Sequence, residues 1–155
     1  MRRVFQIERL SGRKAPLAGV GLQWQPRKGA LMTSGTKADV WPTEIRLKQD
    51  KRTLAVTFED GASFAIPAEL LRVRSPSAEV QGHGPSERKL VPGMAEITIT
   101  RIEPVGNYAV RLVFADGHST GIFTWRLLHE FGRDQGRLMA DYITELEAAG
   151  LSRHR

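Results

Sequence analysis

Residues 117–121 read Gly-His-Ser-Thr-Gly, which matches the G-x-S-x-G pattern of a serine nucleophile held on a sharp turn. Asp116 stands directly before this pattern. The chemistry requires a buried strand before the serine and a long helix that begins at it. Here a β-forming stretch follows, so Ser119 is expected on the return arm of a hairpin. We interpret the pattern as a structural turn and predict no catalytic residues and no enzymatic activity.

Three histidines, His83, His118 and His129, are the remaining candidates for metal chemistry. No two of them have the spacing of the H-E-x-x-H motif, and the chain has no cysteine to supply a thiolate ligand. The glycine-rich patterns that cradle phosphate groups are also missing from the sequence. The residues therefore predict no metal ion and no cofactor.

Alternating apolar and polar residues predict six strands, and Asp-Gly pairs at 60–61 and 116–117 predict tight turns. A short helix is expected after Pro67, a second between Thr124 and Gly132, and an amphipathic third between Asp134 and Gly150. Residues 73–95, rich in proline, glycine and serine, are expected to form a long loop. The expected strands are residues 43–48, 53–58, 63–66, 96–102, 108–114 and 120–123.

The sequence of the first hairpin repeats in the second. Residues 58–66 (FEDGASFAI) match residues 114–122 (FADGHSTGI), and a pair of leucines follows each match. This repeat indicates either a structural duplication or two unrelated hairpins that share common turn residues. In both cases the predicted fold is α+β: a small antiparallel sheet built from two hairpin–helix units, with helices on one face.

Three segments are expected along the chain. Residues 42–132 form the domain, and residues 133–155 form the C-terminal amphipathic helix followed by a frayed end. Residues 1–41 form a basic, disordered extension. The apolar runs are too short to span a membrane, and we expect a cytoplasmic protein.

The formal net charge of +6 lies entirely in residues 1–31, which hold seven basic residues and one acidic residue. The remainder of the chain is neutral. Three interpretations stay open for this segment: a disordered basic tail, a reading frame extended upstream of a natural start at Met32, or an arm that binds nucleic acid.

Three blocks of the sequence resemble a known family. Residues 71–84 (LRVRSPSAEVQGHG) are similar to the signature loop of stand-alone bacterial members of the gamma-butyrobetaine-hydroxylase-like N-terminal domain family. Residues 103–111 (EPVGNYAVR) and 116–125 (DGHSTGIFTW) resemble its second block, and residues 42–47 (PTEIRL) also fit. The resemblance implies a small α+β module. In that family the module precedes an iron- and 2-oxoglutarate-dependent oxygenase domain or accompanies P-loop iron–sulfur carriers.

The resemblance also implies where a metal would lie. The hydroxylase version resembles a zinc module with three cysteines and one histidine. In this chain the cysteine positions hold Ser75, Ser77 and Val80, and His118 is the only ligand position retained. Hydroxyls and a valine cannot complete a tetrahedral zinc site, so no metal is expected.

If the fold transfers, the loop after Arg72 lies near the Asp116–His118 turn. We therefore expect one polar patch that fixes this loop by hydrogen bonds and presents a surface for a partner. Its members are Arg72, Ser75, Ser77, His83, Asp116, His118 and Trp125.

The expected function is that of a non-catalytic adaptor or protein-interaction module with an unidentified protein partner. The proteins and domains that accompany members of this family suggest a link to iron–sulfur or metalloenzyme maturation. One alternative is a metal-binding accessory domain of a 2-oxoglutarate-dependent oxygenase system. A second alternative is a nucleic-acid binder that acts through residues 1–31.

Overall fold

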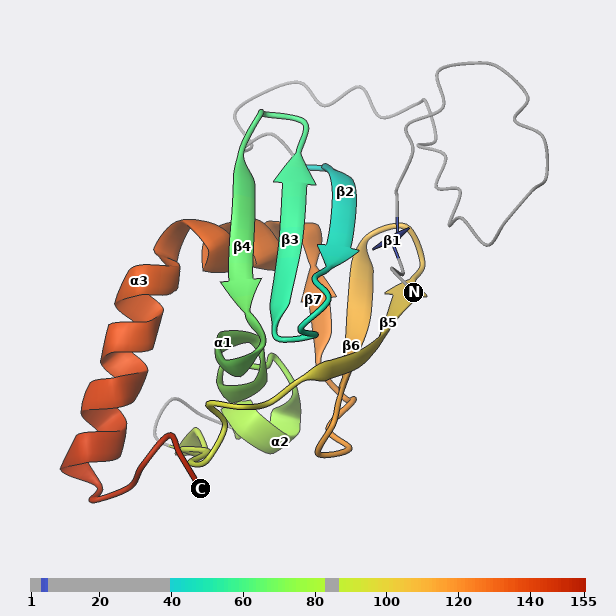
Figure 1. Ribbon diagram of the computed structural model, residues 1–155. Coiled ribbons are helices and arrows are strands. Elements are labelled where there is room, and N and C mark those ends of the chain that lie inside the picture. Colours follow the sequence, from blue (N-terminus) through green and yellow to red (C-terminus); the bar gives the residue numbers. More distant parts are fainter. Residues whose placement is uncertain (1–3, 6–39, 83–86) are drawn as a thin grey trace, which may run out of the picture.

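The computed structural model describes residues 4–5, 40–82 and 87–155 (Figure 1). Helices and antiparallel strands are both present, so the predicted α+β class is confirmed. In chain order the elements are β1 (Val4–Phe5), β2 (Pro42–Leu47), β3 (Thr53–Phe58), β4 (Ser63–Pro67), α1 (Ala68–Val73), α2 (Ala78–Gln81), β5 (Ile99–Val105), β6 (Ala109–Phe114), β7 (Ile122–Thr124) and α3 (Trp125–Ala148).

The strands form two antiparallel sheets where the sequence suggested one, with the orders β1-β2-β3-β4 and β5-β6-β7. Every second residue of β3 is buried, including Val56 and Phe58, and the same holds for Leu112 and Phe114 on β6. All four side chains belong to one core. Each hairpin has only one apolar face. Because the two sheets share a core, the apolar faces of both hairpins are buried.

The two halves of the domain repeat the same geometry. β5, β6 and α3 begin 57, 56 and 57 residues after β2, β3 and α1. A register shift interrupts the pairing near the start of both β2 and β5. The two Asp-Gly turns also match, since Gly61 and Gly117 have φ angles of 85° and 88°, which favour glycine. This match favours a structural duplication. The duplicated unit includes strands and helix starts outside the hairpin residues that match in sequence.

The halves also contact one another reciprocally. Asp60 in the first turn lies 2.9 Å from Nε2 of His129 on α3. Asp116 in the second turn accepts a hydrogen bond of 2.8 Å from Nε of Arg72 on α1. Arg72 and His129 occupy equivalent positions in the repeat, so each turn is held by the helix of the other half. This exchange is the contact pattern of a two-fold symmetric dimer.

Close packing follows the same exchange. A Cβ atom added at Gly121 would meet Oγ of Ser75 at 2.2 Å, and one added at Gly132 would meet Cγ of Phe64 at 2.2 Å. In the strand pairing Pro67 lies opposite Thr53 as Thr124 lies opposite Ala109, which makes Gly121 the structural equivalent of Phe64, one residue out of step with the sequence match. Gly132 stands at the same offset of 57 residues from Ser75. One corner of the domain is therefore packed with an aromatic ring, and the matching corner with a serine hydroxyl.

α3 is one helix, so the predicted end at Gly132 and the new start at Asp134 are wrong. The predicted cap is confirmed, because Oγ1 of Thr124 accepts a 3.2 Å hydrogen bond from the backbone N–H of Leu127. The missing side chain at Gly132 lets the ring of Phe64 pack directly against the helix, and the helix continues through this contact. In Figure 1, α3 passes behind β3 and β4 and then turns to run beside α1.

The predicted frayed end is also wrong. Gly150 follows α3 with a φ of 66° and redirects the chain, as expected from the sequence. Ser152 and Arg153 then accept backbone hydrogen bonds from Gly93 and Ala95. The end of the chain lies beside the segment before β5 (Figure 1).

The predicted extension, residues 1–41, lies mostly outside the described residues. Val4–Phe5 pairs with β2 as a two-residue strand. In the part of the chain that the structure describes, no helix has the length and hydropathy needed to cross a membrane.

Candidate functional site

The loop that follows α1 passes directly under the second hairpin. α1 ends at Val73, and the next residues turn inward, so that Ser75 is fully buried and Ser77 nearly so. Gly121 leaves the space that Oγ of Ser75 occupies, because any side chain there would overlap this oxygen. Gln81 at the end of α2 donates a 3.0 Å hydrogen bond from Nε2 to the carbonyl of Ser75. Ser75 thus contacts the hairpin through its side chain and α2 through its carbonyl.

His118 joins the hairpin to this loop through both ring nitrogens. Nε2 lies 3.0 Å from Oγ of Ser75 and 3.5 Å from Oγ of Ser77. Nδ1 lies 3.1 Å from Oε2 of Glu79, on α2. The side chain of His118 is 4% exposed, and its contacts with the two buried serines are shielded from water, whereas Glu79 is open to solvent. We refer to Ser75, Ser77, Glu79 and His118 together as the His118 lock.

The turn before His118 is fixed separately. Oδ1 of Asp116 accepts a 3.1 Å hydrogen bond from the backbone N–H of His118, while Oδ2 accepts the bond from Arg72. The side chains of Arg72 and Asp116 are 12% and 16% exposed, so this ion pair is partly desolvated. One carboxylate therefore positions the imidazole and ties the turn to α1.

Burial is the main cause that lowers the pKa of His118 below its usual value, and the nearby charge of Arg72 lowers it further. Glu79 and Asp116 act in the opposite direction, but the net shift is downward. A neutral imidazole has one donor and one acceptor nitrogen. The carboxylate at Nδ1 assigns the proton to that nitrogen, so Nε2 accepts from the hydroxyl of Ser75.

Five of the seven residues proposed from the sequence come together: Arg72, Ser75, Ser77, Asp116 and His118. The other two are Trp125 and His83. Trp125 lies at the other end of β6, where its indole N–H donates a 2.9 Å hydrogen bond to the carbonyl of Asn107. His83 lies outside the described residues.

Sequence reasoning missed two members of this site, Glu79 and Gly121. Glu79 is the only acidic residue between Ser75 and the glycine-rich stretch that begins at Gly82, a signal that could have marked it. Gly121 is the second glycine of the G-x-S-x-G pattern. Its role is to admit the hydroxyl of Ser75, and Ser119 follows the tight turn without starting a helix, as predicted.

Hydrogen bonds connect Ser75 to His118 and His118 to Glu79, as they connect a nucleophile, a base and an orienting acid in a catalytic triad. A nucleophile must also reach its substrate, and Ser75 has no exposed surface. Two cavities lie around Arg153, and neither is lined by Ser75, His118 or Glu79, although the larger one reaches Asp116. The hydrogen bonds of this site therefore connect α2 and its loop to the hairpin.

The donors of the His118 lock do not fit zinc. The positions that resemble cysteine ligands supply two hydroxyls and the buried isopropyl group of Val80. Zinc sites in proteins use thiolates, imidazoles and carboxylates, and a structural site needs four of them. No group of three or more such side chains that could hold a metal ion is present in residues 4–5, 40–82 and 87–155.

Comparison with solved structures finds close similarity to two proteins whose structures were determined by NMR in solution. One is 44% identical, with a TM-score of 0.65, over 75% of this chain and 91% of that one. The other is 42% identical, with a TM-score of 0.66, over 79% of this chain and 91% of that one.

A crystal structure from Acidithiobacillus ferrooxidans ATCC 23270, of a DUF971-family protein of unknown function, is 37% identical over 59% of this chain and 91% of that one, with a TM-score of 0.49. No match is found among curated proteins. The family described as gamma-butyrobetaine hydroxylase-like, N-terminal, matches residues 45–129, which include both halves of the repeat and the whole His118 lock. The chain therefore belongs to the gamma-butyrobetaine hydroxylase-like N-terminal domain family.

Proposed function

We propose that this protein is a non-catalytic adaptor, and that it binds a protein partner through the surface of α2 and its loop. The observation that carries the proposal is the His118 lock, which fixes this surface loop from beneath by hydrogen bonds. A loop that is already ordered loses less conformational entropy when a partner binds it. The lock therefore supports a preformed contact surface.

The outer side of α2 is available for such a contact. Ala78, Glu79 and Gln81 are exposed, whereas Val80 between them is buried against the domain. The side chain of Glu79 is 63% exposed even though its carboxylate reaches His118. A partner that binds here would therefore meet one carboxylate already held in position.

The finer proposal is that the partner belongs to iron–sulfur or metalloenzyme maturation. It is supported by the proteins in which related domains occur, and it extends to this chain by family membership alone. The donors of the His118 lock favour an adaptor over a metal-binding accessory domain, since they do not fit zinc.

The test uses the full chain as bait in its native extract. Ala78→Arg adds a long charged side chain to the exposed face of α2, and Ala140→Arg makes the same change on the exposed side of α3. We expect one partner to be captured by the wild type and by Ala140→Arg, but not by Ala78→Arg. Equal capture by all three chains would refute the proposed surface.

A second arm tests the lock and the class of partner. Ser75→Ala removes the hydroxyl that meets His118, and we expect it to weaken capture because α2 is then less firmly held. Metal analysis of the captured protein tests the finer proposal. A partner without iron or another metal would restrict the conclusion to a general adaptor.

A further inference from the structure

The segment Leu151–Arg155 lies in a groove as an extended peptide ligand would. The backbone N–H groups of Gly93 and Ala95 donate hydrogen bonds of 2.9 and 2.8 Å to the carbonyls of Ser152 and Arg153. The absence of a side chain at Gly93 lets Arg155 lie directly on the backbone, since an added Cβ would meet Cγ of Arg155 at 3.0 Å. Backbone hydrogen bonds of this kind are how proteins bind extended peptides irrespective of most side chains.

Arg153 anchors the segment. Its Nε donates a 3.0 Å hydrogen bond to Oε1 of Glu69, and Nη2 pairs with Oε2, so the contact is bidentate. Glu69 lies on α1 and its side chain is only 5% exposed, whereas that of Arg153 is 38% exposed. A buried carboxylate paired with a planar guanidinium is a geometry that lysine cannot reproduce.

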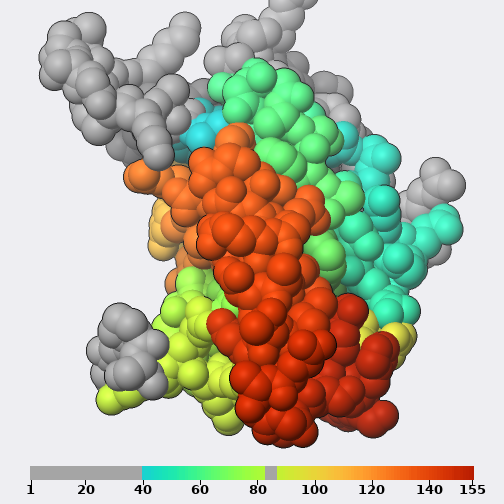
Figure 2. All heavy atoms as spheres, turned by 90° about the vertical axis from the view of Figure 1, so that its left-hand side faces the viewer, coloured from blue at the N-terminus to red at the C-terminus, as the bar shows by residue number. Residues whose placement is uncertain are grey.

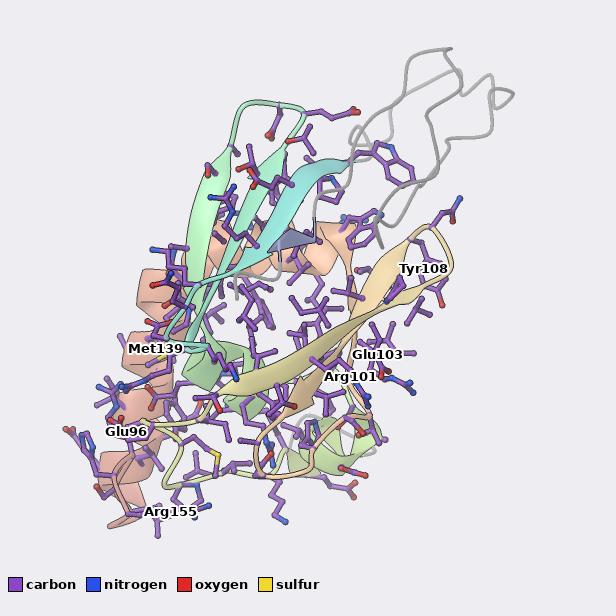
Figure 3. All side chains as sticks on the ribbon, turned by 45° about the vertical axis from the view of Figure 1, so that its right-hand side comes forward. Glu96, Arg101, Glu103, Tyr108, Met139 and Arg155 are labelled. Atoms are coloured by element: carbon purple, nitrogen blue, oxygen red, sulfur yellow. The ribbon has the colours of Figure 1, made fainter. Side chains whose placement is uncertain are left out.

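The groove continues on both sides of this arginine. One cavity of about 380 Å³ and another of about 290 Å³ are each lined by both Ile97 and Arg153. Glu96 and Arg155 line the larger cavity, and Figure 3 shows them at the same end of the molecule. In Figure 2 the dark red residues of the segment lie beside the yellow residues that precede β5.

The groove and the segment that lies in it carry opposite charges. Apart from residues 151–155, the two cavities are lined by four acidic residues and one basic residue: Asp50, Glu69, Glu96, Asp116 and Arg52. Two of the acids are also paired with residues outside the segment, Glu96 with Arg52 and Asp116 with Arg72. The segment contributes two arginines and a histidine, and Glu69 forms its ion pair with Arg153 of this segment. The groove is thus complementary to a basic peptide.

We propose that this groove, formed around Glu69 by residues 93–97 and α1, binds an arginine-containing basic peptide of a partner protein, and that residues 151–155 occupy it in the free chain. The partner's arginine replaces Arg153 on Glu69, and its backbone accepts hydrogen bonds from Gly93 and Ala95. No residue of α2 lines either cavity, so the inference goes beyond the adaptor surface proposed above.

Occupation by the chain itself makes the groove self-inhibited. A tethered segment competes at an effective concentration in the millimolar range, so a free peptide with the same contacts binds the wild-type chain weakly. Weakening the internal arginine removes most of this competition. The free peptide then binds more tightly, although the groove has gained no new contact.

The experiment uses the full chain and a fluorescent peptide with the sequence of residues 150–155, GLSRHR. Arg153→Met keeps the apolar stem of the internal side chain but removes its charge. We expect this variant to bind the peptide at least tenfold more tightly than the wild type. Glu69→Gln combined with Arg153→Met should abolish that gain, and a control peptide with alanine at the first arginine should bind neither chain.

Two measurements keep the result decisive. Circular dichroism and thermal unfolding establish that each variant is folded. If Arg153→Met fails to fold because Glu69 is left unpaired, Arg153→Lys keeps the charge, loses the bidentate pair and should also bind the peptide more tightly than the wild type. Amide NMR signals of Gly93 and Ala95 should shift on peptide addition.

The proposal is wrong if folded Arg153→Met and Arg153→Lys chains bind the peptide no better than the wild type. Equal binding by the double variant would also overturn it, because Glu69 would then play no part. Ala78→Arg should leave peptide binding unchanged, so failure here is separable from failure of the adaptor proposal.

Discussion

Gly121→Ala is the most direct test of the His118 lock. An added Cβ would lie 2.2 Å from Oγ of Ser75 and 3.2 and 3.3 Å from atoms of Phe123 and Pro76. Overpacking of a buried site costs about 1–3 kcal/mol. Displacement of the serine also breaks its hydrogen bond to His118, which is worth about 1 kcal/mol. We therefore expect Gly121→Ala to lower the free energy of unfolding by about 2–4 kcal/mol.

The hydroxyl of Ser75 is the predicted source of most of this cost. Ser75→Ala alone should cost about 1–3 kcal/mol, because it leaves Nε2 of the buried His118 with only the longer contact to Ser77. In the double variant the overlapping oxygen is gone. The cost of the double variant should then be smaller than the sum of the two single costs by at least about 1 kcal/mol.

Urea unfolding of the four chains measures this cycle, provided that the slopes with denaturant agree. Gly136→Ala is the control, since this glycine lies within α3 and nothing is within 4 Å of an added Cβ. It should stabilise the chain by about 1 kcal/mol, as expected for glycine inside a helix. Costs for Gly121→Ala and Ser75→Ala that add within about 0.5 kcal/mol would refute the argument.

The remaining predictions concern titration and metal binding. Burial lowers the folded-state pKa of His118 below 6.5, so the free energy of unfolding should be highest above pH 6.5 and fall as the pH drops through the folded-state pKa. Urea unfolding at several pH values should show that His118→Gln lacks this loss. Burial raises the pKa of Tyr142 to about 12, so ultraviolet titration should find one late-ionising phenol that Tyr142→Phe removes. The triple variant Ser75→Cys, Ser77→Cys and Val80→Cys should bind one zinc ion per chain with His118, and mass spectrometry that finds no zinc would count against this geometry.

The regular elements of the domain are largely predictable from local pattern. Alternation along Thr53–Phe58 and the Asp-Gly turns identify the hairpins, because one face of each is buried. The cap at Thr124 is also local, since it depends on one hydroxyl and the backbone three residues later. These features require no knowledge of the rest of the chain.

The errors arise where distant segments decide the outcome. Gly132 would end a helix by local rules, but the ring of Phe64 packs against it and the helix continues. Residues 152–155 have no pattern that indicates order, yet Glu69 and the backbone of Gly93 hold them. Each outcome depends on a partner far away in the sequence.

The candidate site was predictable only in part, and for the same reason. The family resemblance placed Ser75, Ser77 and His118 near one another, and the structure brings them into contact. It could not place Glu79, which acts by reaching across from α2. Trp125 belongs to the same block of the family resemblance as His118, but β7 carries it to the other end of the sheet.

The reciprocal contacts between the halves give the domain two corners of common design and different use. At one corner the ring of Phe64 packs against Gly132 and the imidazole of His129, so this corner contributes packing. At the other corner the same space beneath a glycine admits a hydroxyl, and a long connection can be attached there. The repeat thus gives its two corners different roles: one contributes packing, and the other fixes the connection that we propose as the surface for a partner.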